Sequence, residues 1–249
     1  MKVLNVEQGS AEWHEARLGK ITGTKLKGIV DLSLPLKDDI IKALNDVGNE
    51  EYKKSWTAQT LLDLLPDEKR QELLDKKPKK LGFYEILAEK IAYQPEDGDP
   101  KPIDRGVELE PEAREKVALH LDEKVEKVGI CISNLHPDIA VSPDGIIKKK
   151  GKVVYAVEIK CLSTARHLQA LIEQRIPEDY KYQVLQYFIV LEDLEVLYFA
   201  FYDPRVVGYE LVVIEVHRDD VAEQIEEHLN YQRQVLAEID RLAEKYSNF

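Results

Sequence analysis

The 249-residue chain has a formal net charge of −12, and 33% of its residues are charged and 44% hydrophobic, as in a soluble globular protein. The negative net charge argues against nucleic-acid binding by a uniformly charged surface. Residues 16–28, however, carry four basic side chains and no acidic one, so a local basic surface for nucleic acid is possible. The two cysteines, Cys131 and Cys161, give neither a disulfide framework nor a zinc-binding spacing.

The first hundred residues are predicted to be helical. Ser10 is expected to cap a helix that ends before Gly19, and a second short helix starts near Thr24. A helical pattern then fills 32–80, with breaks at Pro35, Gly48, Pro66 and Pro78, and is followed by an amphipathic helix over 81–93 and a loop over 94–102.

A helix is predicted over 105–119, after which the hydrophobic period changes from about 3.6 to about 2. The expected strands are 125–133, 139–148, 152–162, 195–202 and 209–216, and the remaining helices are 164–174, 178–191 and 218–246. Residues 149–151 predict a hairpin turn with Gly151 at positive φ. We therefore expect an α+β fold with a central mixed sheet flanked by helices, in one domain over 1–249 that includes a helical segment at about 32–102.

Two charged residues interrupt the apolar strand 152–162. Alternation places Glu158 and Lys160 on one face, and the hairpin brings Asp144, in the first half of the preceding strand, opposite them. Burying such charges without partners is unfavourable, and a divalent metal would neutralise two carboxylates. Oxygen ligands favour Mg²⁺, or alternatively Mn²⁺, over zinc.

Two helices add polar groups to this centre. Glu110 lies on a face of small and apolar residues in helix 105–119, and Gln183 lies on an apolar stripe of the helix 178–191. The pattern resembles the PD-(D/E)xK nucleases, in which Asp144, Glu158 and the Ile159 carbonyl would hold a metal. Lys160 would then position or deprotonate the attacking water. Glu110 would complete a second metal site, and Gln183 would orient Lys160 or the water.

Two other interpretations of these charges stay open. Glu158 and Lys160 would form a partly exposed ion pair without catalytic meaning, or the pair Pro137-Asp138 would supply the aspartate instead of Pro143-Asp144. We prefer Asp144, because Asp138 precedes its strand and has no partner at the hairpin register.

Several stretches in the same order resemble the phage lambda exonuclease family, the YqaJ-type viral recombinases: VEQGSAEWHEARLGKITGT, RGVELEPEAR, SPDG, EIKC, YQVLQY and YFAFYDPR. The resemblance implies a 5′→3′ exonuclease on double-stranded DNA ends that releases mononucleotides and leaves a 3′ single strand. It also implies two metal ions, a homotrimer and a single-strand annealing protein as partner in phage recombination. We expect a cytoplasmic phage or prophage protein in a bacterial host, without a membrane segment.

The resemblance also assigns DNA-binding residues. Arg17 matches the arginine of a pocket for the terminal 5′-phosphate, and Thr24 replaces a serine there. The full set expected to bind DNA is Arg17, Thr22, Thr24, Arg166 and Tyr187. Segment 32–102 matches the family poorly, so no strand-splitting residue is assigned, and Arg105 stands where the phage enzyme has tryptophan.

Two alternative functions are kept beside the exonuclease. The same core serves structure-specific DNA endonucleases, and a chain that keeps the fold without cleavage would be a DNA-end-binding subunit.

Overall fold

The computed structural model describes residues 1–30, 34–75, 79–92 and 105–247. Residue contacts divide the chain into two compact units, the first formed by Met1–Lys27 with Glu85–Phe249 and the second by Gly28–Tyr84. The second unit falls within the predicted helical segment, and the assignment of one nuclease domain to 1–249 stays a prediction. The loop predicted over 94–102 lies outside the described residues.

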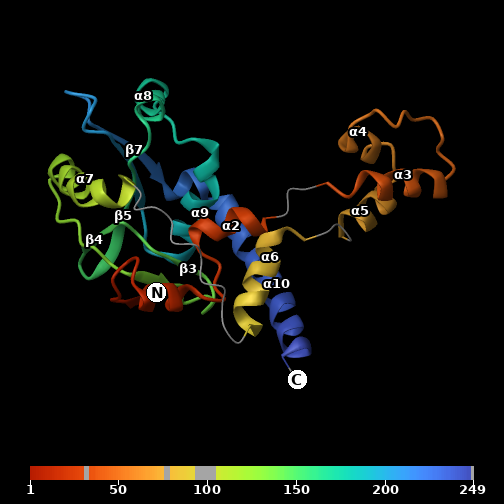
Figure 1. The fold of residues 1–249 in the computed structure, drawn as a ribbon, viewed down its shortest axis with the longest axis horizontal. Coiled ribbons are helices and arrows are strands. Elements are labelled where there is room, and N and C mark those ends of the chain that lie inside the picture. The colour runs from red at the N-terminus through yellow and green to blue at the C-terminus, as the bar shows by residue number, and fades with distance from the viewer. Residues whose placement is uncertain (31–33, 76–78, 93–104, 248–249) are drawn as a thin grey trace. The chain divides into compact units, whose positions relative to one another are not determined.

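A four-stranded mixed sheet forms the centre of the first unit, in the order β4-β5-β6-β7 (Figure 1). Its strands are β4 (Gly145–Lys149), β5 (Lys152–Lys160), β6 (Val196–Tyr202) and β7 (Leu211–His217). Strands β5 and β6 are parallel, whereas the other neighbours are antiparallel. A parallel pair needs a long crossover, which α8 (Thr164–Glu173), η1 (Glu178–Tyr180) and α9 (Lys181–Val190) provide. The predicted α+β fold with a mixed sheet is confirmed.

The two faces of β5 have different partners. Val157 and Ile159 pack against Ala113 and Val117 of α7 (Arg105–Leu121), so the apolar positions of the strand are buried under that helix. Glu158 points to the other face, where α9 meets it. The alternation predicted from the sequence therefore places the charged positions between the sheet and α9.

A second, three-stranded sheet has the order β1-β2-β3, formed by β1 (Lys2–Leu4), β2 (Ile130–Ile132) and β3 (Ala140–Val141). A side chain at Gly129 would collide with the main chain of Leu4 and Val6, so glycine permits the close approach of β1 to this segment. The sequence did not predict β1.

Helices also stand at the start and at the end of the first unit. Helix α1 (Ala11–Arg17) begins at Ser10, whose hydroxyl accepts the Trp13 N–H as predicted. The last elements are η2 (Arg218–Val221) and α10 (Ala222–Tyr246), and α10 packs against α9. Helices α2 (Gly23–Ile29) and α6 (Leu81–Ile91) each have residues in both units.

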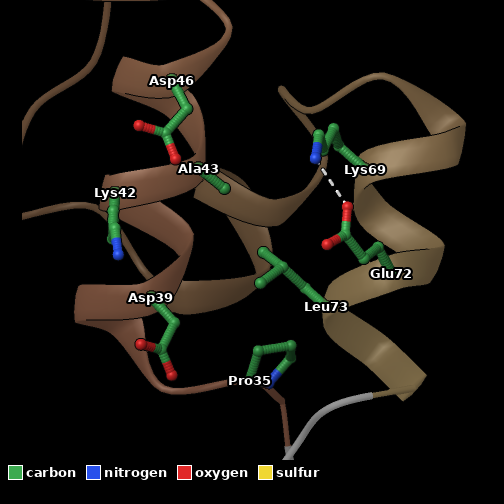
Figure 2. A pocket seen from close by; sticks show the side chains of 8 residues that line it. All are labelled: Pro35, Asp39, Lys42, Ala43, Asp46, Lys69, Glu72 and Leu73. Carbon is green, nitrogen blue, oxygen red and sulfur yellow. Dashed lines mark hydrogen bonds and ion pairs between the residues drawn. The ribbon is translucent and has the colours of Figure 1, made fainter.

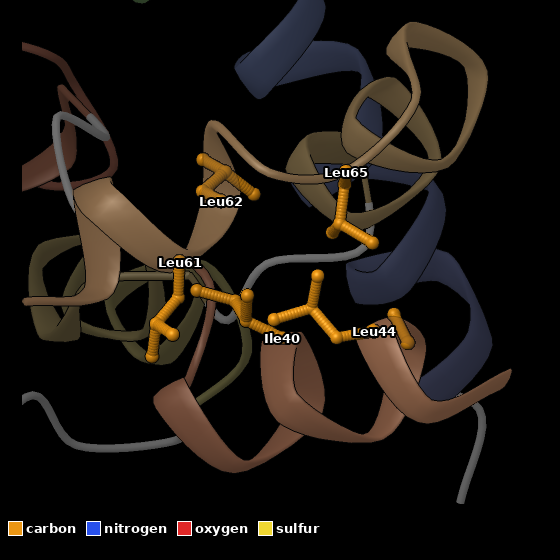
Figure 3. Close-up of a cluster of buried hydrophobic side chains, with 6 residues drawn as sticks. Ile40, Leu44, Leu61, Leu62 and Leu65 are labelled. Atoms are coloured by element: carbon orange, nitrogen blue, oxygen red, sulfur yellow. The ribbon is translucent and has the colours of Figure 1, made fainter. Parts of the chain in front are cut away.

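The second unit consists mainly of three short helices, α3 (Lys37–Asp46), α4 (Ala58–Leu62) and α5 (Asp67–Asp75). Ile40, Leu44, Leu61, Leu62 and Leu65 point toward one another in its core (Figure 3). A pocket of about 290 Å³ lies between α3 and α5, with the Lys69–Glu72 ion pair on its rim (Figure 2). None of its lining residues belongs to the predicted site.

Two strand predictions are wrong in extent. Only Ile130–Ile132 of 125–133 is a strand, and 139–148 is divided into β3 and β4 by Ser142, Pro143 and Asp144. Pro143 has no N–H to give to a ladder, which favours a break at this point. Asp144 therefore lies just before β4 rather than within a strand. The hairpin that follows is confirmed, with φ of +81° at Gly151. Among the described residues, no helix has the length and apolar character needed to cross a membrane.

Candidate active site

Glu158 is the most enclosed charged group of the predicted set, with 2% of its surface exposed. Its Oε1 accepts hydrogen bonds from Lys160 Nζ at 2.5 Å and from Gln183 Nε2 at 2.7 Å, and its Oε2 accepts the hydroxyl of Tyr187. Two of these donors come from α9, so that helix fixes the carboxylate in place. Glu158 and Lys160 do form an ion pair. The Glu158 carboxylate of this pair is buried, whereas the alternative interpretation of the sequence assumes a partly exposed pair.

Asp144 lies against the same strand. Its Oδ2 accepts the main-chain N–H of Ile159 at 2.7 Å, which places the carboxylate beside the stretch from Glu158 to Lys160. Burial raises the pKa of Asp144 well above its usual value, and the negative charges of Glu158 and Glu110 raise it further. Three acidic groups therefore converge at one end of β4 and β5, and a cation there would relieve their repulsion.

Asp138 of the alternative Pro-Asp pair lies in another environment. It forms ion pairs with Lys20 at 3.3 Å and Lys90 at 2.6 Å. Both lysines engage Asp138, whereas the Asp144 carboxylate accepts a main-chain N–H of β5, so the geometry favours Asp144 as the site residue.

Arg114 was not singled out from the sequence, although it lies one helical turn after Glu110. Its Nε donates to the carbonyl oxygen of Asp144 at 2.7 Å, and its Nη2 pairs with the Glu110 carboxylate. One guanidinium therefore connects α7 to the segment before β4. The i, i+4 spacing of Glu110 and Arg114 was a signal for the ion pair, but nothing local indicated the contact with Asp144.

Lys160 lies next to Glu158 with its ammonium 5.1 Å from the ring centre of Tyr180. Burial alone would lower the pKa of Lys160. The interactions with Glu158 and then Asp144 have a larger and opposite effect, so the pKa of Lys160 is raised. In this arrangement the side chain is an ammonium that donates hydrogen bonds. Gln183, expected to orient Lys160 or a water, instead donates to Glu158.

The donors present fit a hard divalent cation. Glu158 offers a buried carboxylate and Asp144 a partly buried one, and the main-chain carbonyl of Ile159 lies between Glu158 and Lys160 in the strand. Burial, and after it the negative charges of Glu158 and Glu110, raise the pKa of Asp144, and a cation beside these carboxylates would offset the effect of the charges. Within the described residues, no group of three His, Cys, Asp or Glu side chains is arranged as a metal site, so the carbonyl or water oxygens would have to complete the shell.

A second cluster surrounds Arg17 at the end of α1. Its Nη1 donates to Ser142 Oγ at 2.9 Å, and its Nη2 donates to the hydroxyls of Thr22 at 3.3 Å and Thr24 at 3.2 Å. The guanidinium also lies 4.1 Å from the ring centre of Trp13. Ser142 and Trp13 were not assigned to this site from the sequence.

The charge of Arg17 is poorly compensated. Burial lowers the pKa of Arg17 to about 10, and Glu89 opposes this shift. No carboxylate in the described part of the chain forms an ion pair with it. A partly buried guanidinium whose neighbours are hydroxyls that can also donate is suited to an anion.

The other two residues expected at the DNA lie apart from this cluster. Arg166 on α8 is exposed and lies 4.0 Å from Asp179. Tyr187 is fully buried behind Glu158, where its hydroxyl is already engaged. Its position suits support of the carboxylate, and a direct contact with DNA would require it to leave the core.

The family model described as the YqaJ-like viral recombinase domain matches residues 12–192, a range that holds both clusters. The chain belongs to this family. The resemblance noted in the sequence is thereby confirmed, and the YqaJ-like match ends shortly before β6.

The chain is also similar in fold to solved structures. An alkaline exonuclease from Laribacter hongkongensis, also solved in complex with dAMP, aligns with a TM-score of 0.62 at 21% identity, over 95% of this chain and 97% of that one. A phage-related exonuclease from Haemophilus somnus 129PT aligns with a TM-score of 0.49 at 12% identity, over 91% and 96% of the two chains. A search of curated proteins found no significant match.

Proposed function

We propose that this YqaJ-like protein is a metal-dependent exonuclease that degrades double-stranded DNA from the 5′ end and releases mononucleotides. The observation that carries the proposal is the convergence of Asp144, Glu158 and Lys160 at one end of the β4–β5 hairpin. Glu110, Asp144, Glu158, Lys160 and Gln183 are the proposed catalytic set.

Asp144, Glu158 and the Ile159 carbonyl would hold Mg²⁺, or Mn²⁺ in its place, and Glu110 would contribute to a second ion. A bound divalent ion supplies a water of lowered pKa and neutralises charge that develops on the phosphate. Gln183 and Tyr187 keep Glu158 in one orientation, because each donates to a different oxygen of the carboxylate. Lys160, as an ammonium, would position the attacking water or stabilise the phosphate oxygens.

The cluster around Arg17 would bind the terminal 5′-phosphate. Among the described residues, no acid forms an ion pair with the Arg17 guanidinium, and the hydroxyls of Thr22, Thr24 and Ser142 lie within 3.3 Å of it. A phosphate would accept from the guanidinium and from the hydroxyls together. Because Ser142 lies two residues before Asp144, the end-binding site would lie close to the carboxylates.

The relatives agree with this activity. The Laribacter protein is an alkaline exonuclease and was solved with dAMP, a deoxynucleoside monophosphate. For the present chain we propose the same class of reaction, with mononucleotide products. A 3′ single strand would remain for an annealing protein of a phage recombination system, and the active form would be a homotrimer in the bacterial cytoplasm.

The first experiment follows digestion of a linear duplex labelled at either 5′ or 3′ end, with Mg²⁺ and after removal of divalent ions by EDTA. We expect early release of the 5′ label as a mononucleotide, late release of the 3′ label, and no release in EDTA. Glu158→Gln should abolish release. Early release of the 3′ label would contradict the direction.

Two other results would favour the alternatives. Nicking of covalently closed circular DNA would indicate a structure-specific endonuclease. Binding of duplex ends without cleavage of any DNA form, at any Mg²⁺ or Mn²⁺ concentration, would indicate an end-binding subunit.

A further inference from the structure

Gln186 is a fully buried amide on α9 that belongs to neither of the clusters described above. Its Nε2 donates to two main-chain carbonyls, that of Ile21 at 3.0 Å and that of Ala140 at 3.2 Å. A single side chain thus ties together two segments that are more than one hundred residues apart in the sequence.

These two segments carry the hydroxyls that bind Arg17. Ile21 directly precedes Thr22, and Ala140 lies two residues before Ser142. The segments meet in a short parallel bridge, in which Ile21 N–H donates to Asp138 at 2.8 Å and Ala140 N–H donates to Ile21 at 3.0 Å. Beside the two bonds of this bridge, the Gln186 amide donates one hydrogen bond to each segment and so holds one hydroxyl-bearing segment against the other.

Gln232 of α10 holds the Gln186 amide from behind. Its Nε2 donates to Gln186 Oε1 at 3.0 Å, so the amide is oriented with its nitrogen toward the two carbonyls. Gln232 is itself fully buried, and its own Oε1 has no hydrogen-bond partner among the described residues. An unsatisfied buried oxygen is unfavourable, and an apolar side chain of the same length would avoid it. The hydrogen bond to Gln186 is the favourable contribution that the Gln232 amide makes against this cost.

The same helix reaches the carboxylate centre. Gln183 and Tyr187, which flank Gln186 on α9, both donate to Glu158. Helix α9 is therefore attached to Glu158 through two side chains and to the Arg17 cluster through a third. A rigid helix with both attachments would set the spacing between the terminal phosphate and the bond to be cut.

We propose that Gln186, oriented by Gln232, is a positioning residue for recognition of the terminal 5′-phosphate. This inference rests on the proposed function, and it adds a role for two buried amides that touch neither DNA nor the metal. Helix α10 thereby takes part in recognition of the DNA end, although it lies outside the residues that the family model matches.

The test compares Gln232→Met and Gln186→Met with Gln234→Met, an exposed position on the same helix α10. Methionine keeps the length of the side chain and removes the amide. Initial rates are measured against the concentration of duplex with 5′-phosphate or 5′-hydroxyl ends, at saturating Mg²⁺, after thermal melting has established that each variant is folded.

We expect KM for phosphorylated ends to rise about fivefold in Gln232→Met, the effect of roughly one lost hydrogen bond. In Gln232→Met, kcat and the rates on 5′-hydroxyl ends should change little. In Gln186→Met, the rise in KM for phosphorylated ends should be larger than in Gln232→Met. Gln234→Met should match the wild type. If Gln186→Met fails to fold, the result of Gln232→Met decides.

Two outcomes would overturn the inference alone: an unchanged preference for phosphorylated ends, or an equal fall of kcat on both kinds of end, as a general loss of folded protein would give. A wild-type protein that degrades DNA without regard to the 5′ end would overturn the proposed phosphate pocket and this inference together. Absence of any nuclease activity would overturn the proposed function itself.

Discussion

Arg114 Nε lies 2.7 Å from the carbonyl oxygen of Asp144, and the same guanidinium pairs with Glu110. The arginine thus holds two of the proposed metal-site residues from two elements, α7 and the segment before β4. Because a guanidinium presents donors in a planar fork, it can make both contacts at once, whereas an ammonium cannot reproduce this geometry.

Arg114→Lys should therefore retain the charge but lose activity. We expect kcat/KM on duplex DNA to fall about 10- to 100-fold, the range for one or two hydrogen bonds to charged groups. The measurement is the initial rate of nucleotide release at several Mg²⁺ concentrations. Arg175→Lys, at an exposed position that forms an ion pair with Glu173, serves as the control. Wild-type activity in Arg114→Lys would show that the two contacts are dispensable.

Lys160→Ala tests the proposed ammonium at the reacting centre. We expect kcat to fall by about 10²- to 10³-fold, the usual effect of removing one donor that stabilises the transition state. Lys152→Ala is a matched control on the same strand, because Lys152 is exposed and pairs with Asp193. Both variants are assayed on the same labelled duplex. Full activity in Lys160→Ala would exclude the assigned role.

Arg17→Ala should separate end recognition from the chemical step. The preference for 5′-phosphorylated over 5′-hydroxyl ends should disappear, because the guanidinium that contacts Thr22, Thr24 and Ser142 is gone. Arg17→Lys should restore only part of the preference, since a lysine lacks the fork. The Mg²⁺ concentration for half-maximal rate should stay the same. An equal loss on both kinds of end would contradict the pocket, and Arg233→Ala on the exposed face of α10 is the control.

Asp138 gives a pH-dependent contribution to stability away from the carboxylate centre. Burial alone would raise the pKa of Asp138. The hydrogen bonds and positive charges of Lys90 and Lys20 have a larger and opposite effect, so the pKa of Asp138 is lowered. A carboxyl with a lowered pKa in the folded state stabilises the fold at neutral pH, and this contribution is lost as the pH falls through about 4 and below.

The free energy of unfolding of Asp138→Asn should therefore be lower than that of the wild type at pH 7, and the two should converge near pH 3. Urea denaturation at pH 7, 5, 4 and 3 measures the difference. Asp193→Asn, which removes an exposed partner of Lys152, should show a smaller effect. A constant difference across the pH range would mean that the charge of Asp138 is not the stabilising feature.

Local signals in the sequence were sufficient for several parts of the site. The Ser10 cap and the turn at Gly151 depend on a few neighbouring residues, and both occur as predicted. The hairpin then pairs Gly145 with Val157, which leaves Asp144 opposite the charged end of β5. The tight turn predicts the hairpin, but this register also depends on an irregularity in the pairing between Ile147 and Lys148, which period-two alternation does not predict.

Other parts were predicted incompletely because they depend on packing. Tyr187 was grouped with DNA-binding residues, yet it lies buried behind Glu158. Gln183 was expected at Lys160 or a water and donates to Glu158 instead. A helical stripe shows which side of α9 is buried, but it does not show which strand residue each side chain meets.

The sequence by itself determined the β4–β5 hairpin and thereby the position of Asp144 beside the Glu158 strand, because both follow from contacts between near neighbours. Only the tertiary structure decided how α7 and α9 come to the two faces of that strand, and so brought Arg114 to Asp144 and Tyr187 to Glu158. These contacts join residues far apart in the sequence, and they depend on how apolar surfaces pack rather than on any local pattern.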